Sequence, residues 1–354
     1  MLKILLISHP EQDYLEALVV AGLLELPDVE VSLFPPKMLY VGQTISTFDP
    51  ITSWCIKTSP EDHYLKSFSG SIHPAPWWSP PKLPKLIDSW DKLDLREFDA
   101  VVFTPRFCGV KLMWEIVSKY GRDKIKKLVL LDGEDYFDVR WDLAAAFSPD
   151  LYLKLSHVPS FSGVFERPGI SCAIKPFSYC TIPPRLLPKI SSTRERCLYV
   201  RMGITHPLRK LVLDSLQGMG IPLAGNTPPE NESLSWSAAS GLSGFMSYMT
   251  DLGRYSASLV LRGHGHNPMR MFEASAMGSA MLLDAPIPVT INPPWVDGEN
   301  CFYTDPTRLD IISQIRAIFD RNDLIDVGLR GREFVLNNHT CIHRAKQLLE
   351  MTLC

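Results

Sequence analysis

The stretch Leu259–Asp284, LVLRGHGHNPMRMFEASAMGSAMLLD, decides the fold. Its first three residues predict a short buried strand, and the loop after them contains two glycines and several hydrogen-bond donors. The apolar spacing from Met269 to Met277 predicts a helix that stops at Gly278, and the next apolar run predicts a second strand. A glycine loop between a strand end and a helix start presents backbone N–H groups and the positive end of the helix dipole. The stretch therefore predicts an anion site, best suited to a diphosphate.

Two residues of the predicted helix sharpen this interpretation. Arg270 lies in the first turn, where a cation opposes the helix dipole and is disfavoured unless it holds an anion. Glu273 follows on the same face, where a carboxylate can accept hydrogen bonds from the hydroxyls of a ribose or a sugar. The alternative is an ordinary strand, loop and helix with a surface Arg–Glu pair.

The same residues carry a family resemblance. RGHGHNPMRMFEASAMGSAMLL, at 262–283, resembles the nucleotide-sugar-binding segment of GT-B glycosyltransferases, in particular the exostosin-like and CgeB-like groups with the pattern RGxGxxxxRxFEAxAxGxxxLL. A weaker likeness continues through 295–300 and 331–344. Retaining enzymes of the large group-4 type carry a Glu eight residues before the second Glu, and Gly265 stands there in this chain. His264, His266 or Asn267 would then take over its role, unless the role is met differently.

Strand and helix patterns alternate along the chain, from the strand at 3–8 and the helix at 14–26 onward. This alternation predicts α/β domains with parallel sheets, whose ligands bind at the carboxyl ends of the strands. The resemblance implies the GT-B architecture, with two doubly wound Rossmann-like domains facing across a cleft. We expect an acceptor-binding domain at 1–188, a nucleotide-sugar-binding domain at 189–338, and a helix at 339–354 that packs back towards the first domain.

Acidic residues follow the predicted strand 127–131 in the first domain. Three acids, Asp132, Glu134 and Asp135, surround a glycine at the edge of the sheet where an open α/β fold places its site. One of them could bind acceptor hydroxyls or act as a base. The alternative is a turn with solvated acids, one of which caps the next helix.

Basic residues follow the first predicted strand of the second domain, 196–200. Arg201 and Gly203 end that strand, and Arg209 lies on the helix predicted at 207–217. By the resemblance, a basic pair here neutralises the leaving diphosphate, and Arg201, Arg209 and Lys210 are the candidates. The alternative for Arg209 and Lys210 is a solvated helix face.

The segment 37–91 interrupts the alternation. It combines Trp54, Trp77, Trp78 and Trp90 with a cluster of prolines, and prolines prevent long regular elements. It is either an irregular insertion or an aromatic platform for a sugar or base of the acceptor, since flat rings suit both.

The bulk properties exclude several classes. A hydrophobic content of 45% with 21% charged residues is typical of a globular protein, and a net charge of -3 argues against a generally basic nucleic-acid surface. The eight cysteines form no C-x-x-C pair, so reduced thiols are expected. The chain has no D-x-D pair, so we expect no metal. We also expect neither a membrane span nor a targeting signal, and therefore a cytoplasmic protein. A dinucleotide oxidoreductase would carry the motif G-x-G-x-x-G after its first strand. Residues 8–13 read SHPEQD there, which argues against that class.

Together these features predict a glycosyltransferase that moves a sugar from a nucleotide diphosphate sugar to an acceptor hydroxyl, without metal or other cofactor. The resemblance implies a UDP-sugar donor and retention of the anomeric configuration. The acceptor is open among a glycan, a protein, a small molecule and a modified DNA base. The open alternatives are a nucleotide-sugar hydrolase or epimerase and a non-catalytic nucleotide-binding module. The candidate catalytic residues are Asp132, Glu134, His264 and Glu273. The candidate nucleotide-sugar-binding residues are Arg201, Gly203, Arg209, Arg262, Gly263, Gly265, His266, Asn267, Arg270 and Glu273.

Overall fold

The computed structural model describes residues 1–7, 13–35, 81–158, 172–203, 206–225, 241–284, 288–305 and 310–353. Three members of the proposed aromatic platform, Trp54, Trp77 and Trp78, lie outside the described residues. The fourth, Trp90, packs on the core of unit 1, with its ring centroid 4.9 Å from that of Phe34. The chain divides into two compact units: unit 1, Met1–Phe177 with Cys341–Cys354, and unit 2, Ser178–Thr340. The first division falls after Phe177, whereas the sequence pattern predicted it after residue 188.

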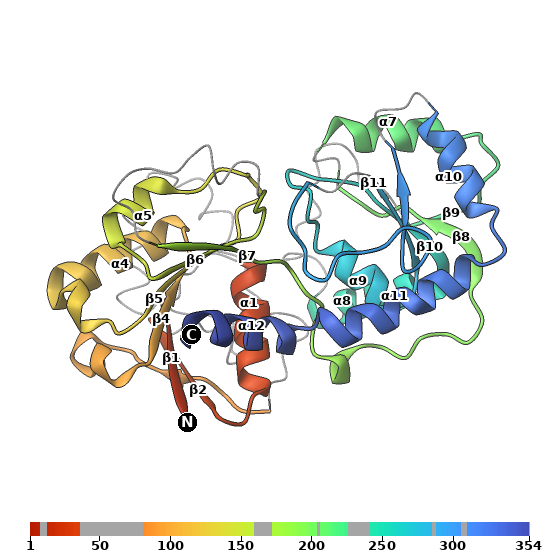
Figure 1. The fold of residues 1–354 in the computed structure, drawn as a ribbon. Helices are drawn as coiled ribbons and strands as arrows, with labels where there is room; N and C mark the ends of the chain where they lie inside the picture. Colours follow the sequence, from red (N-terminus) through yellow and green to blue (C-terminus); the bar gives the residue numbers. More distant parts are fainter. Residues whose placement is uncertain are drawn as a thin grey trace. The chain divides into compact units, whose positions relative to one another are not determined.

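Among the described residues, unit 1 contains a sheet of seven strands in the order β3-β2-β1-β4-β5-β6-β7 (Figure 1). Neighbouring strands are parallel; Ile4 of β1, for example, lies opposite Val31 of β2 and Ala100 of β4. The strands are β1 (Leu2–Ile7), β2 (Val29–Phe34), β3 (Lys85–Leu86), β4 (Ala100–Phe103), β5 (Leu128–Asp132), β6 (Leu151–Lys154) and β7 (Ala173–Pro176). The α-helices are α1 (Tyr14–Glu25), α4 (Phe107–Tyr120), α5 (Trp141–Phe147) and α12 (Cys341–Leu353), with short 3-10 turns at Trp90–Lys92, Leu95–Glu97 and Arg122–Lys124.

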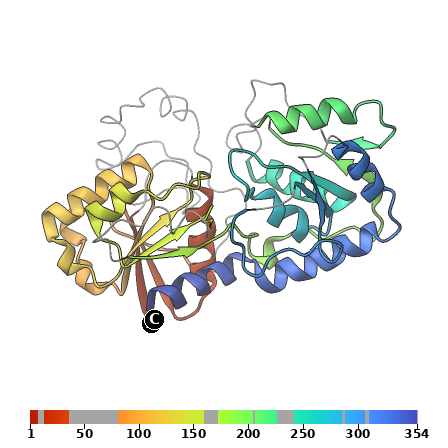
Figure 2. The same ribbon diagram turned by 45° about the horizontal axis from the view of Figure 1, so that its top comes forward.

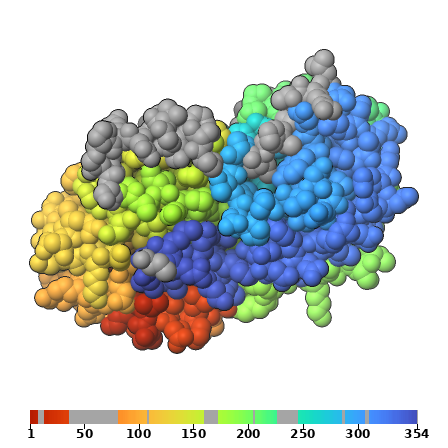
Figure 3. Space-filling view, in the orientation of Figure 1, coloured from red at the N-terminus to blue at the C-terminus, as the bar shows by residue number. Residues whose placement is uncertain are grey.

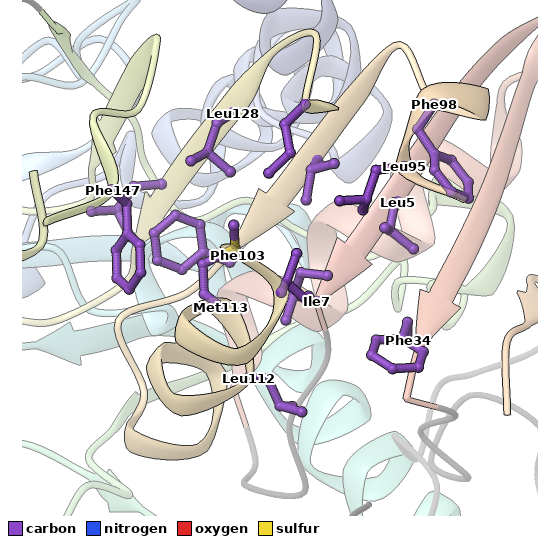
Figure 4. Packing of buried hydrophobic residues seen from close by; sticks show 14 of the residues in the cluster. Leu5, Ile7, Phe34, Leu95, Phe98, Phe103, Leu112, Met113, Leu128 and Phe147 are labelled. Atoms are coloured by element: carbon purple, nitrogen blue, oxygen red, sulfur yellow. The ribbon is translucent and has the colours of Figure 1, made fainter. Parts of the chain in front are cut away.

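The central strands of unit 1 are apolar because helices cover both faces of the sheet. On one face, Phe103 of β4 meets Phe147 of α5 with ring centroids 5.3 Å apart, and Met113 of α4 packs in the same cluster (Figure 4). Buried side chains such as Leu5 and Leu128 complete this layer. The predicted parallel sheet is confirmed.

On the other face, α12 packs along α1, so that residues from the two ends of the sequence lie together in unit 1 (Figure 3). Helix α1 is apolar almost all round because the sheet and α12 both cover it. The side chain of Asp13 caps its start by accepting hydrogen bonds from the N–H groups of Leu15 and Glu16. At Gly22 the helices come so close that a Cβ atom would lie 1.9 Å from the carbonyl oxygen of Cys341.

Unit 2 contains a second parallel sheet, with the described strands in the order β12-β11-β10-β8-β9. These strands are β8 (Glu195–Tyr199), β9 (Leu223–Ala224), β10 (Tyr255–Val260), β11 (Ala280–Asp284) and β12 (Phe302–Thr304). The helices are α7 (Pro207–Leu216), α8 (Gly241–Arg254), α9 (Arg270–Ala276), α10 (Ile311–Phe319) and α11 (Leu324–Asn338), with a 3-10 turn at Pro184–Leu186. The strand, helix and strand predicted within 259–284 are confirmed as β10, α9 and β11.

Helices cover both faces of the second sheet. Helices α7 and α10 pack together on one face, whereas α8, α9 and α11 pack on the other (Figure 2). Helix α9 is the innermost of the second group, because α8, α11, β10 and β11 all contact it. Residues 271–276 of α9 are therefore buried, and only Arg270 at its start is partly exposed.

Each sheet has a point where the chain reverses the direction in which it adds strands. In unit 1 this point lies between β1 and β4, and in unit 2 it lies between β8 and β10. Connections leave such a point on opposite faces of the sheet, which opens a crevice at the carboxyl ends of the two strands. The segment Arg201–Gly203 after β8 and the loop 262–267 after β10 flank the crevice of unit 2.

Substituting Gly22→Ala tests the close packing of α1 on α12. The added methyl group would meet a backbone carbonyl that cannot turn away, so we expect unit 1 to lose about 1–3 kcal/mol of unfolding free energy. Gly253→Ala in α8 is the matched control, because its Cβ would meet only the flexible end of Met277. Urea denaturation of both variants makes the measurement, and equal stability in the two would contradict the packing.

Candidate functional site

The loop after β10 is held by contacts among its own residues and with β11. The backbone N–H of Arg262 donates to Asp284 Oδ1 at 2.9 Å, and its guanidinium Nε donates to the other oxygen of that carboxylate. Its Nη1 lies 2.7 Å from His266 Nε2, and burial together with the nearby Arg262 charge lowers the pKa of His266. A neutral His266 can accept the hydrogen bond from Arg262. Much of the Arg262 side chain is therefore engaged in shaping the loop.

Arg209 ties the two sides of the crevice together. From α7 its guanidinium donates to the carbonyl of Gly203, after β8, at 2.7 Å. It also donates to the carbonyls of Leu261 and Arg262, after β10, both at 2.8 Å. Arg209 therefore fixes the spacing of the two strand ends. The alternative of a solvated helix face is wrong for Arg209 but describes Lys210, which is exposed and lies near Asp214.

The two glycines and Asn267 of the loop are buried. The N–H of Gly263 donates to the carbonyl of Gly265 at 3.1 Å, and both glycines are buried. Asn267 is fully buried, whereas His264 is exposed. His264 is thus the loop residue that meets solvent most openly.

The start of α9 differs from the predicted helix-dipole site. The helix has seven residues, and the N–H groups of Met271 and Phe272 donate to the carbonyls of Pro268 and Met269. The N–H of Glu273 also donates to the carbonyl of Met269. Because local carbonyls take these three amides, nearby side chains must supply binding groups in addition to the backbone N–H groups of the loop.

Two arginines and one carboxyl gather around the ring of Tyr248, which projects from α8. The guanidinium carbon of Arg270 lies 5.6 Å from the ring centroid, and that of Arg201 lies 6.0 Å from it. The Tyr248 hydroxyl donates to Glu273 Oε2 at 2.9 Å and accepts from Arg270 Nε at 3.1 Å. We call Arg201, Tyr248, Arg270 and Glu273 the arginine cluster. With two guanidinium groups to one carboxyl, it carries excess positive charge and suits an anion.

Glu273 is the buried carboxyl group of the arginine cluster, and burial disfavours its charged form. It is only 3% exposed, and burial raises its pKa to about 7 against the opposing effects of Arg270 and the Tyr248 hydrogen bond. Within the described part of the chain, its Oε1 atom has no hydrogen-bond partner. A buried carboxylate oxygen without a donor is costly, and a hydroxyl of a bound ligand would relieve that cost.

Helix α9 is anchored at the end that points away from the cluster. Arg194 Nη2 donates to the carbonyl of Met277 at 2.9 Å, and Arg332 Nη1 donates to that of Ala276. Ser275 Oγ donates to the carbonyl of Gly331 on α11 at 2.8 Å. Cations at the final carbonyls favour the helix dipole, so these contacts fix the position of Arg270 and Glu273.

The crevice also depends on one glycine. Gly225, just after β9, has φ +88°, and a Cβ there would lie 3.1 Å from Cβ of Arg201. A larger residue would therefore strain the backbone and displace Arg201.

The two acidic candidates of unit 1 have different surroundings. Asp132 is fully buried, and its Oδ2 accepts from Tyr152 and, at 2.9 Å, from the buried Lys154. Its Oδ1 accepts from the N–H of Glu134, and Lys154 also donates to the carbonyl of Glu134. Asp132 and Lys154 therefore hold the backbone of Glu134 in place.

Glu134 itself is half-buried at the carboxyl edge of the sheet. Burial raises its pKa, and the nearby Asp132 raises it further, whereas Arg140, Lys154 and Arg106 oppose the shift. A carboxyl group with a raised pKa is the better suited of the two to exchange a proton. Asp132 and Glu134 belong to unit 1, and the other candidates belong to unit 2.

Sequence reasoning missed Tyr248, which the structure places at the centre of the arginine cluster. Its position in α8 is 25 residues from Glu273 in the sequence, and no local motif marks it.

Among the described residues, no group of three or more His, Cys, Asp or Glu side chains is arranged to hold a metal ion. None of the described helices is both long and apolar enough to cross a membrane.

Comparison with known proteins gives matches in both sequence and structure. Residues 213–350 match a protein family described as glycosyl transferase-like. No curated protein sequence matches the chain.

Similar solved structures cover nearly the whole chain. Sucrose-phosphate synthase from Thermosynechococcus elongatus has a TM-score of 0.56 and 12% identity, over 99% of this chain and 98% of its own. HepE from Anabaena, in complex with UDP and glucose, has a TM-score of 0.57 and 10% identity, over 99% of both chains. TarM has a TM-score of 0.59 and 10% identity, over 100% of this chain and 99% of its own.

The raised pKa of Glu273 predicts a pH dependence of stability. A carboxyl group whose pKa rises from 4.5 to about 7 on folding stabilises the protein below pH 4.5, and this stability is lost as the pH rises towards 7. The loss is on the order of 3 kcal/mol. Glu273→Gln should remove this component. We expect chemical denaturation at pH 5 and pH 8 to show a smaller difference in the variant than in the wild type; equal differences would show that Glu273 titrates normally.

Proposed function

We propose that this chain, which has the GT-B fold, is a glycosyltransferase whose arginine cluster binds the nucleoside diphosphate part of a UDP-sugar donor. This proposal rests on one observation. Arg201 and Arg270 lie beside the buried carboxyl of Glu273, whose Oε1 atom has no hydrogen-bond partner among the described residues. A nucleoside diphosphate offers complementary groups, because its diphosphate is an anion and its ribose carries hydroxyl donors. HepE, which shares the fold, was solved with UDP and glucose.

In the proposed complex, Arg201 and Arg270 contact the diphosphate, and Glu273 accepts hydrogen bonds from the ribose or the donor sugar. Arg262 and Arg209 act mainly by holding the crevice in shape, since their donors bind Asp284 and backbone carbonyls. His264 is the exposed residue of the loop and remains a candidate for contact with the donor sugar.

The reaction transfers the sugar from the diphosphate to an acceptor oxygen. The bond between the anomeric carbon and the diphosphate oxygen breaks, and its electron pair stays on the diphosphate. A bond forms between the acceptor oxygen and the anomeric carbon, and the acceptor hydroxyl loses its proton. The transition state carries positive charge on the sugar ring and growing negative charge on the diphosphate. Arg201 and Arg270 would stabilise that negative charge, so the reaction would proceed without a metal ion.

The acceptor belongs to unit 1 in this proposal. Glu134, supported by the buried Asp132 and Lys154, would bind the acceptor hydroxyl and take its proton. A glycan, a protein side chain, a small molecule and a modified DNA base all present such a hydroxyl. Retention of the anomeric configuration follows from the resemblance of 262–283 to retaining enzymes. We also propose that the protein is cytoplasmic.

Donor binding is tested with UDP in the presence of EDTA. We expect UDP at a hundred times its dissociation constant to stabilise the wild type by about 2.7 kcal/mol, seen as a raised melting temperature. Arg270→Ala should lower both UDP affinity and donor turnover at least tenfold, because one charged contact to a diphosphate contributes on the order of 2–4 kcal/mol. Arg321→Ala is the matched control, since Arg321 lies on the surface and pairs with Asp323.

The screen includes GDP, ADP, CMP and dTDP and is repeated with magnesium. A shift only with magnesium would contradict metal-independent binding. The absence of a shift with every nucleotide would contradict the donor site itself. Sugar release at the same rate with and without acceptor would identify a hydrolase, and nucleotide binding without turnover of any donor would identify a binding module.

A further inference from the structure

We propose that Tyr248 is a positioning residue of the donor site, whose hydroxyl holds Glu273 and Arg270 in the arrangement that binds the ribose and the diphosphate. This role rests on the proposed function and adds a residue that the motif at 262–283 does not contain. Tyr248 comes from α8, whereas Glu273 and Arg270 share α9. It is therefore a link between two helices that the sequence motif does not provide.

The geometry gives the hydroxyl two opposite roles at once. It donates to Glu273 Oε2 at 2.9 Å and accepts from Arg270 Nε at 3.1 Å. Tyr248 is only 5% exposed, so its hydroxyl is shielded from competing solvent. A phenol can donate one hydrogen bond and accept others, which lets it join a carboxylate to a guanidinium. Neither phenylalanine nor a second cation or anion could satisfy both neighbours.

The hydroxyl also determines which atoms are left for a ligand. It occupies Oε2 of Glu273, and Oε1 is the oxygen without a hydrogen-bond partner among the described residues. It occupies Nε of Arg270, and a guanidinium still has donors on its two terminal nitrogens. Terminal nitrogens suit a phosphate oxygen pair, and a free carboxylate oxygen suits a hydroxyl. Tyr248 therefore separates the anion-binding function of Arg270 from the hydroxyl-binding function of Glu273.

The ring of Tyr248 supports the same arrangement. Both Arg201 and Arg270 lie near it, at 6.0 Å and 5.6 Å from its centroid, and an aromatic ring attracts cations held near its face. On the other side of α9, α11 contributes the small residues Gly328 and Gly331, which approach the backbone at Gly278 and Asn300. The ring of Tyr248 contacts the two arginines, whereas its hydroxyl bonds Glu273 and Arg270. Tyr248→Phe therefore removes the hydroxyl contacts and keeps the ring.

Several charged and titratable groups surround this site. Arg270 favours the charged form of Glu273 from its own helix, and Tyr248 favours it from α8. At the end of β8, Tyr199 is influenced by Arg201, Arg270 and Asp251. Burial and the adjacent Glu273 raise the pKa of Tyr248 well above its usual value, so it stays a neutral hydroxyl near pH 7. Glu273 is therefore the group of the cluster that titrates near neutral pH.

The test compares Tyr248→Phe with the wild type without any ligand. Loss of the hydrogen bond removes a contact that favours the carboxylate, so the pKa of Glu273 should rise. The pH range over which the wild type loses stability ends near 7, and in Tyr248→Phe it should extend to higher pH. Unfolding free energies measured by denaturant at pH 5 to 9 give this result. A uniform loss of stability at every pH would show that Tyr248 is only structural and would overturn the proposal.

The second readout is UDP affinity at pH 7.0 and pH 8.5. We expect Tyr248→Phe to bind UDP roughly fivefold more weakly at pH 7.0, as a one-unit rise from a pKa of about 7 would produce, and to recover most of this loss at pH 8.5. Titration of UDP itself is common to both proteins and cancels in the ratio. A ratio that is the same at both pH values would contradict the positioning role.

Tyr255→Phe is the matched control, because Tyr255 stacks on Tyr199 in the same unit with ring centroids 5.6 Å apart. It should leave both pH profiles unchanged. The ligand-free readout keeps the proposal separate from the proposed function. If the wild type bound no nucleotide, the donor site would fail, while the stability profile would still decide whether the Tyr248 hydroxyl controls Glu273.

Discussion

The burial of Glu273 beside Arg270 is the interaction on which the arrangement of unit 2 depends. A carboxylate at 3% exposure is costly, and the structure meets only part of that cost with the hydroxyl of Tyr248 and the charge of Arg270. The remaining oxygen requires a donor that the described residues do not supply. A site with this deficit is ready for a ligand that brings hydroxyl groups and negative charge together.

The rest of the crevice is built to keep that deficit in place. Arg209 sets the distance between the ends of β8 and β10, and Arg262 joins the loop after β10 to Asp284 of β11. Arg194 and Arg332 hold the far end of α9. Four arginines are thus used on backbone carbonyls or one carboxylate so that Arg201 and Arg270 can face a ligand. Unit 1 shows a similar arrangement, because the buried Asp132 and Lys154 hold the backbone of the partly exposed Glu134.

Sequence patterns predicted the parallel sheets because short runs such as 100–103 and 280–283 are continuously apolar, as strands covered on both faces are. The structure buries both runs. The start of α9 and its final glycine were predictable for the same local reasons. The roles of Arg209 and Arg262 were not, because an arginine near a strand end reads the same whether it faces a phosphate or a carbonyl. Tyr248 was beyond prediction because its partners come from another helix, and only tertiary packing brings them together. The residues assigned to catalysis and donor binding stay predictions.

The most direct measurement is a crystal structure of the protein with UDP bound in the absence of divalent metal. The central claim predicts diphosphate oxygens within hydrogen-bonding distance of Arg201 and Arg270, and a ribose hydroxyl donating to Glu273 Oε1. UDP bound elsewhere on the chain, with the arginine cluster unchanged and unoccupied, would contradict it.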